Sequence, residues 1–255
     1  MIVKHNLTAM NSQRMLGLTQ RAQKSTTEKL SSGYKINRAA DDAAGLSISE
    51  KMRRQIRGLS QASLNAQDGI SCVQTAEGAL AEVEEMLQRM NELAVKGETD
   101  TLTSTDRGYI ASEISQLMSE IDRVKETTTF NEQSLLDGSF ANKNLQVGAE
   151  SDTDNKITVT IDSIATSSIG ATSGVAASLI TTFKGYATAG ASKAEVTSSN
   201  YANLNKWAKQ AIKDISETRS ELGAIQNRLE HTIANLDNVV ENTTAAESQI
   251  RDTDM

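Results

Sequence analysis

Apolar and small residues recur along the last quarter of the chain at alternating steps of four and three positions. The repeat runs without a slip through Leu204, Ala208, Ala211, Ile215, Thr218, Leu222, Ile225, Leu229, Thr232, Leu236, Val239, Thr243, Ala246 and Ile250. This spacing is typical of a helix in a left-handed coiled coil, in which the repeated positions form one seam. Because several seam positions are only Thr or Ala, we expect the helix to depend on partner helices, with a rod core that includes Leu222, Ile225, Leu229 and Leu236.

Two earlier stretches show the same helical period and are the natural partners of this seam. Apolar residues recur from Ala66 to Ala94 and again from Ile110 to Val124 at steps of three and four. The chain contains no Pro, which suits long uninterrupted helices. The pattern therefore predicts a mainly α fold, an elongated antiparallel helical bundle or coiled-coil rod.

The segments between these helices contain turn formers and one alternating apolar pattern. Residues 96–108 are polar and bounded by Gly, which predicts a loop, with Ser104 or Thr105 as the N-cap of the next helix. Residues 144–149 and 156–162 predict a β-hairpin whose turn is 150–155.

Two further segments have weaker apolar patterns. Residues 164–199 are rich in Ser, Thr, Ala and Gly, so we expect a variable, mobile or exposed insert; O-linked sugars there are a less favoured alternative. Residues 5–35 are expected to be helical, but their patchy apolar face indicates that they rely on partners.

Composition limits the function classes that the chain can belong to. The net charge of −7 argues against a nucleic-acid partner, and the one basic run, Lys51, Arg53, Arg54 and Arg57, reads as a solvated helix face. Neither a secretory signal at the N-terminus nor an apolar run long enough to span a membrane is present, so no membrane insertion is expected. Cys72 stands alone in an apolar stretch and is expected to be a small buried residue.

The sequence offers no case for catalysis, a cofactor or a metal. A zinc peptidase would need two His at i and i+4 on one helix with an adjacent Glu. The two histidines, His5 and His231, lie far apart and carry no such motif. We therefore expect a protein that is not an enzyme.

Several long motifs resemble one family closely. The segments "KLSSGYKINRAADDAAGLSISEKMRRQIRGLSQASLNAQDGISCVQTAEGAL", "LQRMNELAVKG", "EIDRVKETTTFN" and "LGAIQNRLEHTIANLDNVVENTTAAESQIRDTDM" are similar to bacterial flagellin. The resemblance covers about 1–163 and 200–255. It implies a structural subunit of the flagellar filament that serves motility and binds other flagellin subunits. It also implies export by the flagellar type III apparatus and a secreted, extracellular location in the bacterial flagellum.

The resemblance also implies a domain organisation. Residues 1–41 correspond to an N-terminal inner-tube helix, 42–163 to the N-terminal rod helices with the hairpin, 164–199 to the variable insert and 200–255 to the C-terminal rod helix. In the family a further stretch follows this point and forms the C-terminal inner-tube helix. The expectation is thus that the chain is truncated before that partner helix.

Recognition by the host's Toll-like receptor 5 is a second implication of the resemblance. Arg89, Leu93 and Glu113 match the family positions that contact the receptor. One helix turn separates Arg89 from Leu93, so both were expected on one exposed face. The alternative is that Arg89 forms a plain i, i+4 pair with Glu85 and that Leu93 packs internally.

Two other functions remain open from the sequence. A hook–filament junction protein shares terminal patterns with flagellin, although the dense match over "LQRMNELAV" favours the filament subunit. A truncated, secreted receptor-binding protein that does not polymerise is the other alternative.

Overall fold

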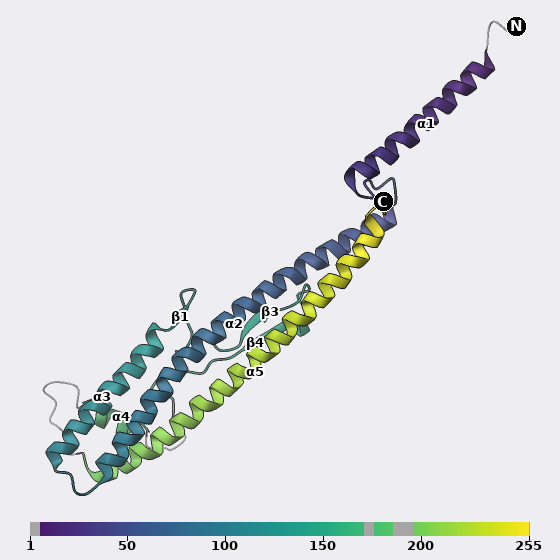
Figure 1. Cartoon of the computed structure of the whole chain (residues 1–255). Helices are drawn as coiled ribbons and strands as arrows, with labels where there is room; N and C mark the ends of the chain where they lie inside the picture. The colour runs from purple at the N-terminus through teal and green to yellow at the C-terminus, as the bar shows by residue number, and fades with distance from the viewer. Residues whose placement is uncertain (1–5, 171–175, 186–195, 255) are drawn as a thin grey trace. The chain divides into compact units, whose positions relative to one another are not determined.

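The computed structural model describes residues 6–170, 176–185 and 196–254, and the fold over these ranges is mainly α. The elements in order are α1 Leu7–Ser32, α2 Ala43–Glu98, α3 Ser104–Thr127, β1 Thr129–Phe130, β2 Gln133–Ser134, β3 Lys143–Gln146, η1 Thr153–Asn155, β4 Lys156–Val159, α4 Ala176–Lys184 and α5 Ser198–Arg251 (Figure 1). The prediction of a mainly α fold with a small β-hairpin is confirmed. No helix within the described ranges has an apolar stretch long enough to cross a membrane.

The chain divides into two compact units. Unit 1 contains the described residues of 1–62, 148–150 and 234–255, and unit 2 contains those of 63–147 and 151–233. The helices α2 and α5 each contribute one part to each unit. Each unit is described below by itself.

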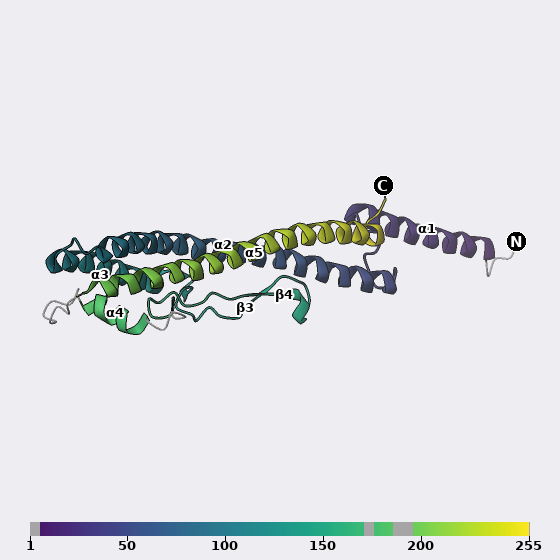
Figure 2. The ribbon, with the colours of Figure 1, turned by 90° about the horizontal axis from the view of Figure 1, so that it is seen from below.

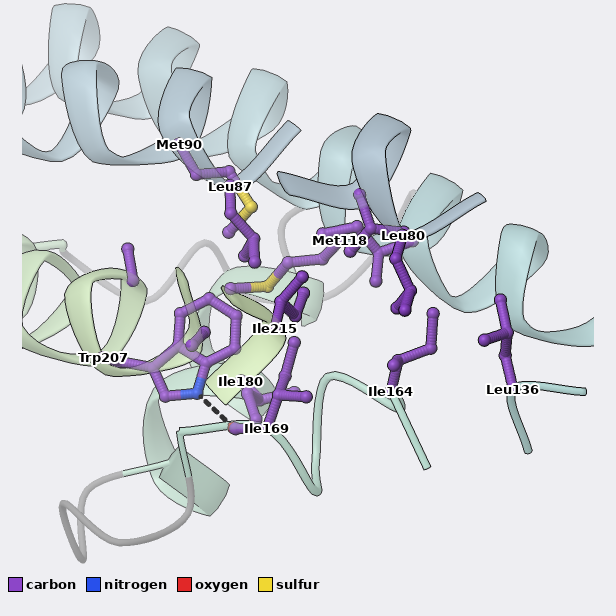
Figure 3. Packing of buried hydrophobic residues seen from close by; sticks show 14 of the residues in the cluster. Leu80, Leu87, Met90, Met118, Leu136, Ile164, Ile169, Ile180, Trp207 and Ile215 are labelled. Atoms are coloured by element: carbon purple, nitrogen blue, oxygen red, sulfur yellow. Dashed lines mark hydrogen bonds between the residues drawn. The ribbon is translucent and has the colours of Figure 1, made fainter. Parts of the chain in front are cut away.

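Unit 2 holds the main hydrophobic core, which α2, α3, α4 and α5 enclose together with the segment that follows β4. Here α2 and α5 run side by side (Figures 1 and 2), joined by the ion pair between Glu84 and Arg219. They are antiparallel, because Gly97 lies against Tyr201 while Gly69 lies against Leu229. The largest side chain in this core is Trp207 of α5, whose indole nitrogen donates a hydrogen bond to the Ile169 carbonyl oxygen at 3.0 Å (Figure 3). Because that nitrogen has a partner, the ring can be buried without leaving a polar group unsatisfied.

The seam predicted from the sequence of α5 packs in the hydrophobic clusters from Leu204 to Val239. None of its positions is exposed. The residues Leu222, Leu229 and Leu236 are buried, and Ile225 is partly buried and packs against the cores. Between Thr218 and Val239 the seam positions alternate between partly buried and buried. The stripe on α2 is buried from Ala66 to Ala94 except at Ile70, which is partly buried.

Unit 1 brings the first part of α2 against the last part of α5. Leu59 and Ala62 pack on Leu236. Farther along the same antiparallel pair, the Arg251 guanidinium donates to the Glu50 carboxylate at 2.7 Å and lies 5.0 Å from the centroid of the Tyr34 ring. The Arg251 carbonyl oxygen also accepts a hydrogen bond from the backbone N–H of Lys35 at 2.7 Å, so the chain after α1 is joined to the end of α5.

The predicted hairpin is present in unit 2. Strands β3 and β4 pair antiparallel, with Asn144 opposite Thr158 and Leu145 opposite Ile157. The alternation buries Ile157 and Val159 and leaves Thr158 exposed, as the period of a strand requires. The sequence missed a second, shorter pair, β1 with β2, which turns at Asn131 and Glu132, both at positive φ.

The joint between α2 and α3 differs from the prediction. Helix α2 continues to Glu98 and α3 begins at Ser104, so the loop is shorter than 96–108. The N-cap is Thr103, not Ser104 or Thr105. The reason is a capping box: the Thr103 hydroxyl accepts from the Asp106 N–H at 3.3 Å, while the Asp106 carboxylate accepts from the Thr103 N–H at 3.1 Å.

The insert 164–199 is only partly the exposed loop that its composition indicated. Within it, α4 was missed, and the side chains of Leu179, Ile180 and Phe183 are buried in the core of unit 2. Ile164 and Ile169 are buried as well. The prediction of exposure is therefore wrong for these residues. Residues 171–175 and 186–195 lie outside the described residues, so the prediction is not tested there.

Candidate functional site

Arg89 on α2 and Glu113 on α3 form an ion pair on the surface of unit 2. The Arg89 Nε and Nη2 atoms both donate to one Glu113 carboxylate oxygen, at 3.1 and 2.9 Å. The Nη1 atom donates to the Glu92 carboxylate at 3.1 Å. These hydrogen bonds raise the pKa of Arg89 above its ordinary value, those to Glu113 most strongly. Glu85, the partner in the alternative interpretation, is not among the ion pairs of Arg89 in the described chain.

Leu93 does not share this surface. Its exposed fraction is 3%, and it belongs to the hydrophobic core of unit 2. The expectation that Arg89 and Leu93 lie on one exposed face is therefore wrong for Leu93. Leu93 lies three residues after the buried Met90 and so belongs to the apolar stripe of α2. The spacing of Leu93 from Arg89 alone did not show this.

The accessible residues of the predicted receptor patch, Arg89 and Glu113, thus form a charged cluster with Glu92, which was not predicted. The side chains of Arg89, Glu92 and Glu113 are 51%, 68% and 46% exposed. Carboxylates from two helices, Glu92 of α2 and Glu113 of α3, accept hydrogen bonds from the guanidinium and orient it. Such a planar cation with a fixed orientation is suited to recognition by another protein.

Helix α1 is the other surface with the means to bind a partner. It is well delimited, because the Asn6 side chain accepts from the Ala9 N–H at 3.1 Å and Gly33, at φ 74°, ends the helix by donating to the Lys29 carbonyl oxygen. Nevertheless, none of its residues is buried. A helix with no packed face in its own chain is only marginally stable in water and gains most from an external partner.

Four of the six large apolar residues exposed on α1 lie on one side of its first half. The exposed fraction is between 52% and 72% for Leu7, Met10, Met15, Leu16, Leu18 and Leu30. With 3.6 residues per turn, four of these fall within an arc of about 140°: Leu7, Met10, Met15 and Leu18. We call these four residues the α1 face. The sequence indicated a patchy pattern that needs partners but did not single out these residues.

Nothing in the described residues supports a metal or catalytic site. No group of three His, Cys, Asp or Glu there is placed to hold a metal ion. His231 is exposed on α5, and His5 lies outside the described residues. Cys72 is free and buried, and burial raises the pKa of its thiol. A buried thiol with a raised pKa is a poor nucleophile.

A small acidic cleft in unit 2 also serves the fold. It has a volume of about 350 Å³, and its walls include Asp162, Asp214, Glu217 and Glu221. The Asp214 carboxylate accepts from the Gly170 N–H at 3.0 Å and from the Gln210 amide at 2.7 Å. The Asp214 side chain therefore anchors the segment after β4 to helix α5.

Comparison with known proteins gives consistent matches. The family model of the bacterial flagellin N-terminal helical region matches residues 3–141, and that of the C-terminal helical region matches residues 206–255. A flagellin from Halalkalibacterium halodurans is 49% identical over 255 residues, which cover 100% of this chain and 87% of that protein.

Two solved structures are similar in fold. The crystal structure of Bacillus cereus flagellin gives a TM-score of 0.51 at 25% identity and covers 68% of this chain and 88% of that one. A putative flagellar hook-associated protein from Vibrio parahaemolyticus gives a TM-score of 0.66 over 83% of this chain and 100% of that one. Its identity is 13%, so this second likeness concerns the fold alone.

Proposed function

The chain belongs to the bacterial flagellin family and is a structural subunit of the flagellar filament, and from this premise we propose that the α1 face is a contact through which one copy binds the next. The observation that carries the proposal is that α1 is a capped helix in which no residue is buried, while Leu7 and Leu18 are 72% and 54% exposed. Burying apolar side chains of this size contributes about 1.5–3 kcal/mol each.

A charge placed on the α1 face tests this contact. We expect the double variant Leu7→Glu/Leu18→Glu to remain monomeric under conditions in which the unmodified chain forms pelletable assemblies. Two carboxylates in a closing apolar interface would have to be desolvated without a partner. Because the chain buries no residue of α1, the variant should keep the thermal unfolding of units 1 and 2 unchanged.

The matched control places the same two charges on the other side of the helix. Gln20 and Gln23 are exposed and lie opposite the α1 face, so Gln20→Glu/Gln23→Glu should assemble as the unmodified chain does. Filaments of ordinary length from Leu7→Glu/Leu18→Glu in electron micrographs would refute the contact. Equal loss of assembly in both variants would assign the effect to net charge and not to the α1 face.

We further propose that the protein reaches the filament through the flagellar type III export apparatus and functions outside the cell. Family membership supports this proposal. In a flagellated host that expresses the chain, inactivating the export apparatus should leave it inside the cell. Its appearance in the medium of such a mutant would refute the proposed route.

Toll-like receptor 5 is proposed as a host partner of the exposed cluster Arg89, Glu92 and Glu113. Support comes from the exposure of these side chains and from the hydrogen bonds that orient the Arg89 guanidinium. Leu93, as a buried residue, is proposed to act only by positioning this part of α2. The receptor binding measurement is described in the Discussion.

The alternative of a hook–filament junction protein has less support. The similar hook-associated structure shares 13% identity with this chain, against 49% for the flagellin from Halalkalibacterium halodurans. The other alternative, a secreted receptor-binding protein that does not polymerise, predicts no assembly from any variant, and the assembly assay above distinguishes it.

A further inference from the structure

The methionines of the chain differ sharply in their exposure. Met10 and Met15 on α1 are 63% and 54% exposed. Met90 and Met118 are fully buried in the core of unit 2, with an exposed fraction of 0%. Met52 and Met86 are partly buried. Both strongly exposed methionines of the described chain therefore lie on the α1 face, between Leu7 and Leu18.

Exposure determines how fast a thioether is oxidised. With hydrogen peroxide, the sulfur attacks one peroxide oxygen, the O–O bond breaks, an S–O bond forms and water leaves. The sulfur loses two electrons and the peroxide gains them, which gives methionine sulfoxide. A sulfur enclosed in a core is protected, so the reaction should concentrate at Met10 and Met15.

We propose that Met10 and Met15 form an oxidation-sensitive site that controls whether the α1 face can bind a second copy of the chain. This inference rests on the proposed contact between copies. Methionine suits such a contact, because its unbranched thioether adapts to irregular apolar surfaces. The sulfoxide is polar and chiral, and burying it without a hydrogen-bond donor opposes association.

The position of the site makes the effect selective for assembly. No residue of α1 is buried in the described chain, so α1 contributes no side chain to the hydrophobic cores. Oxidation of Met10 and Met15 should therefore leave both units folded. Oxidation of Met90 or Met118, by contrast, would place a polar group in the core of unit 2. Low doses of peroxide thus act on association before they act on folding.

The experiment exposes the full 255-residue chain, as a dilute monomer, to hydrogen peroxide, then removes the oxidant and measures three quantities. Peptide mass spectrometry should show Met10 and Met15 oxidised at least about tenfold faster than Met90 and Met118. The pelletable fraction should fall severalfold. The thermal unfolding midpoint should stay unchanged. Treatment with methionine sulfoxide reductases should restore assembly.

Two variants locate the effect. Met10→Leu/Met15→Leu removes both exposed sulfurs, so peroxide should not lower its pelletable fraction below that of the same variant left untreated. Met52→Leu/Met86→Leu is the matched control and should lose assembly after peroxide as the unmodified chain does. In assemblies formed before treatment, Met10 and Met15 should be protected.

The outcomes separate this inference from the contact on which it rests. Normal assembly of the oxidised chain, or an equal loss of assembly in Met10→Leu/Met15→Leu after peroxide, overturns the oxidation site and leaves the contact standing. Equal oxidation of Met10 and Met15 in monomer and assembly overturns the contact itself. Failure of the untreated chain to assemble overturns both.

Discussion

Gly97 and Tyr201 are in such close contact that no side chain fits between them. A Cβ atom at Gly97, in the last turn of α2, would lie 2.5 Å from the Cδ1 and Cε1 atoms of the Tyr201 ring. The ring cannot easily move away. Its hydroxyl donates to the Arg107 carbonyl oxygen at 2.5 Å, and Phe183 packs against it with ring centroids 5.4 Å apart.

Gly97→Ala should therefore lower the free energy of unfolding by about 1–3 kcal/mol, the usual cost of overpacking a core. Urea denaturation of the purified chain measures this change. The matched control is Gly78→Ala in the interior of α2, where a Cβ would meet nothing within 4 Å. The free energy of unfolding of that variant should rise by up to about 1 kcal/mol, because Ala has a better helix propensity than Gly. A higher free energy of unfolding in both variants would show that the Tyr201 ring can move away from position 97 at little cost.

Asp122 on α3 holds the insert in place through its contacts with Lys184 and Thr166. Its carboxylate pairs with the Lys184 ammonium at the end of α4 and accepts from the Thr166 N–H at 3.1 Å. Burial raises the pKa of Asp122, but the hydrogen bonds from Lys184 and Thr166 outweigh it and set the pKa below its ordinary value of 3.8. The folded state thus stabilises the ionised carboxylate.

The consequence is a defined dependence of stability on pH. With a depressed pKa, the contribution of Asp122 is complete above its unfolded pKa of about 4 and is lost as the pH falls through the lower, folded value. Asp122→Asn should cost about 1–3 kcal/mol at pH 7, since it breaks charge-assisted hydrogen bonds. The difference from the unmodified chain should shrink below pH 4.

Asp152→Asn provides the control for this measurement. Asp152 is exposed and forms no ion pair in the described part of the chain, so its variant should unfold like the unmodified chain at pH 7. If the loss in Asp122→Asn were the same at pH 7 and at pH 3, the effect would come from packing and not from ionisation.

Leu229 lies in a small satellite core of unit 2. It is fully buried and packs with Ala66 of α2 and with Val147 and Ile157 near the hairpin. Leu229→Ala should cost about 2–5 kcal/mol, because it removes buried apolar contacts and leaves a cavity. Leu64→Ala is the control: Leu64 is 53% exposed, and the change should stay within about 0.5 kcal/mol. If chemical denaturation showed an equally small loss of unfolding free energy in Leu229→Ala and Leu64→Ala, the satellite core would rearrange around the missing side chain at little cost.

The long elements could be predicted from the sequence because many positions repeat one signal. In α5 the four–three alternation persists for nearly the whole helix, so single Thr and Ala positions do not hide it. The β3–β4 hairpin was also predicted, since Ile157 and Val159 alternate with polar neighbours. In both cases the period of the pattern equals the period of the backbone.

Features that depend on partners distant in sequence were missed. Helix α4 is short, and only its contact with the core of unit 2 explains the burial of Phe183. At the start of α3, several hydroxyl residues compete for the N-cap, and the carboxylate of Asp106 selects Thr103. Leu93 was misplaced because its spacing from Arg89 says nothing about which helix lies on the other side. Such features require the tertiary neighbours to be known.

The exposed ion pair of Arg89 and Glu113 leads to the last prediction, on receptor binding. Arg89→Ala should weaken binding to a Toll-like receptor 5 ectodomain by more than about 1 kcal/mol, since truncating an oriented Arg at an interface commonly has such an effect. Surface plasmon resonance with the monomeric chain measures it. The control is Arg123→Ala, which removes an Arg that is 60% exposed, against 51% for Arg89, and is paired with Glu120 on α3. Binding should be unchanged in this variant.

Leu93→Ala should act differently from both Arg variants. Because Leu93 is buried, this change should lower thermal stability as well as affinity. Equal affinity of Arg89→Ala and the unmodified chain would remove Arg89 from the receptor site. A parallel loss in Arg123→Ala would attribute the effect to overall charge, which steers association without specifying a site.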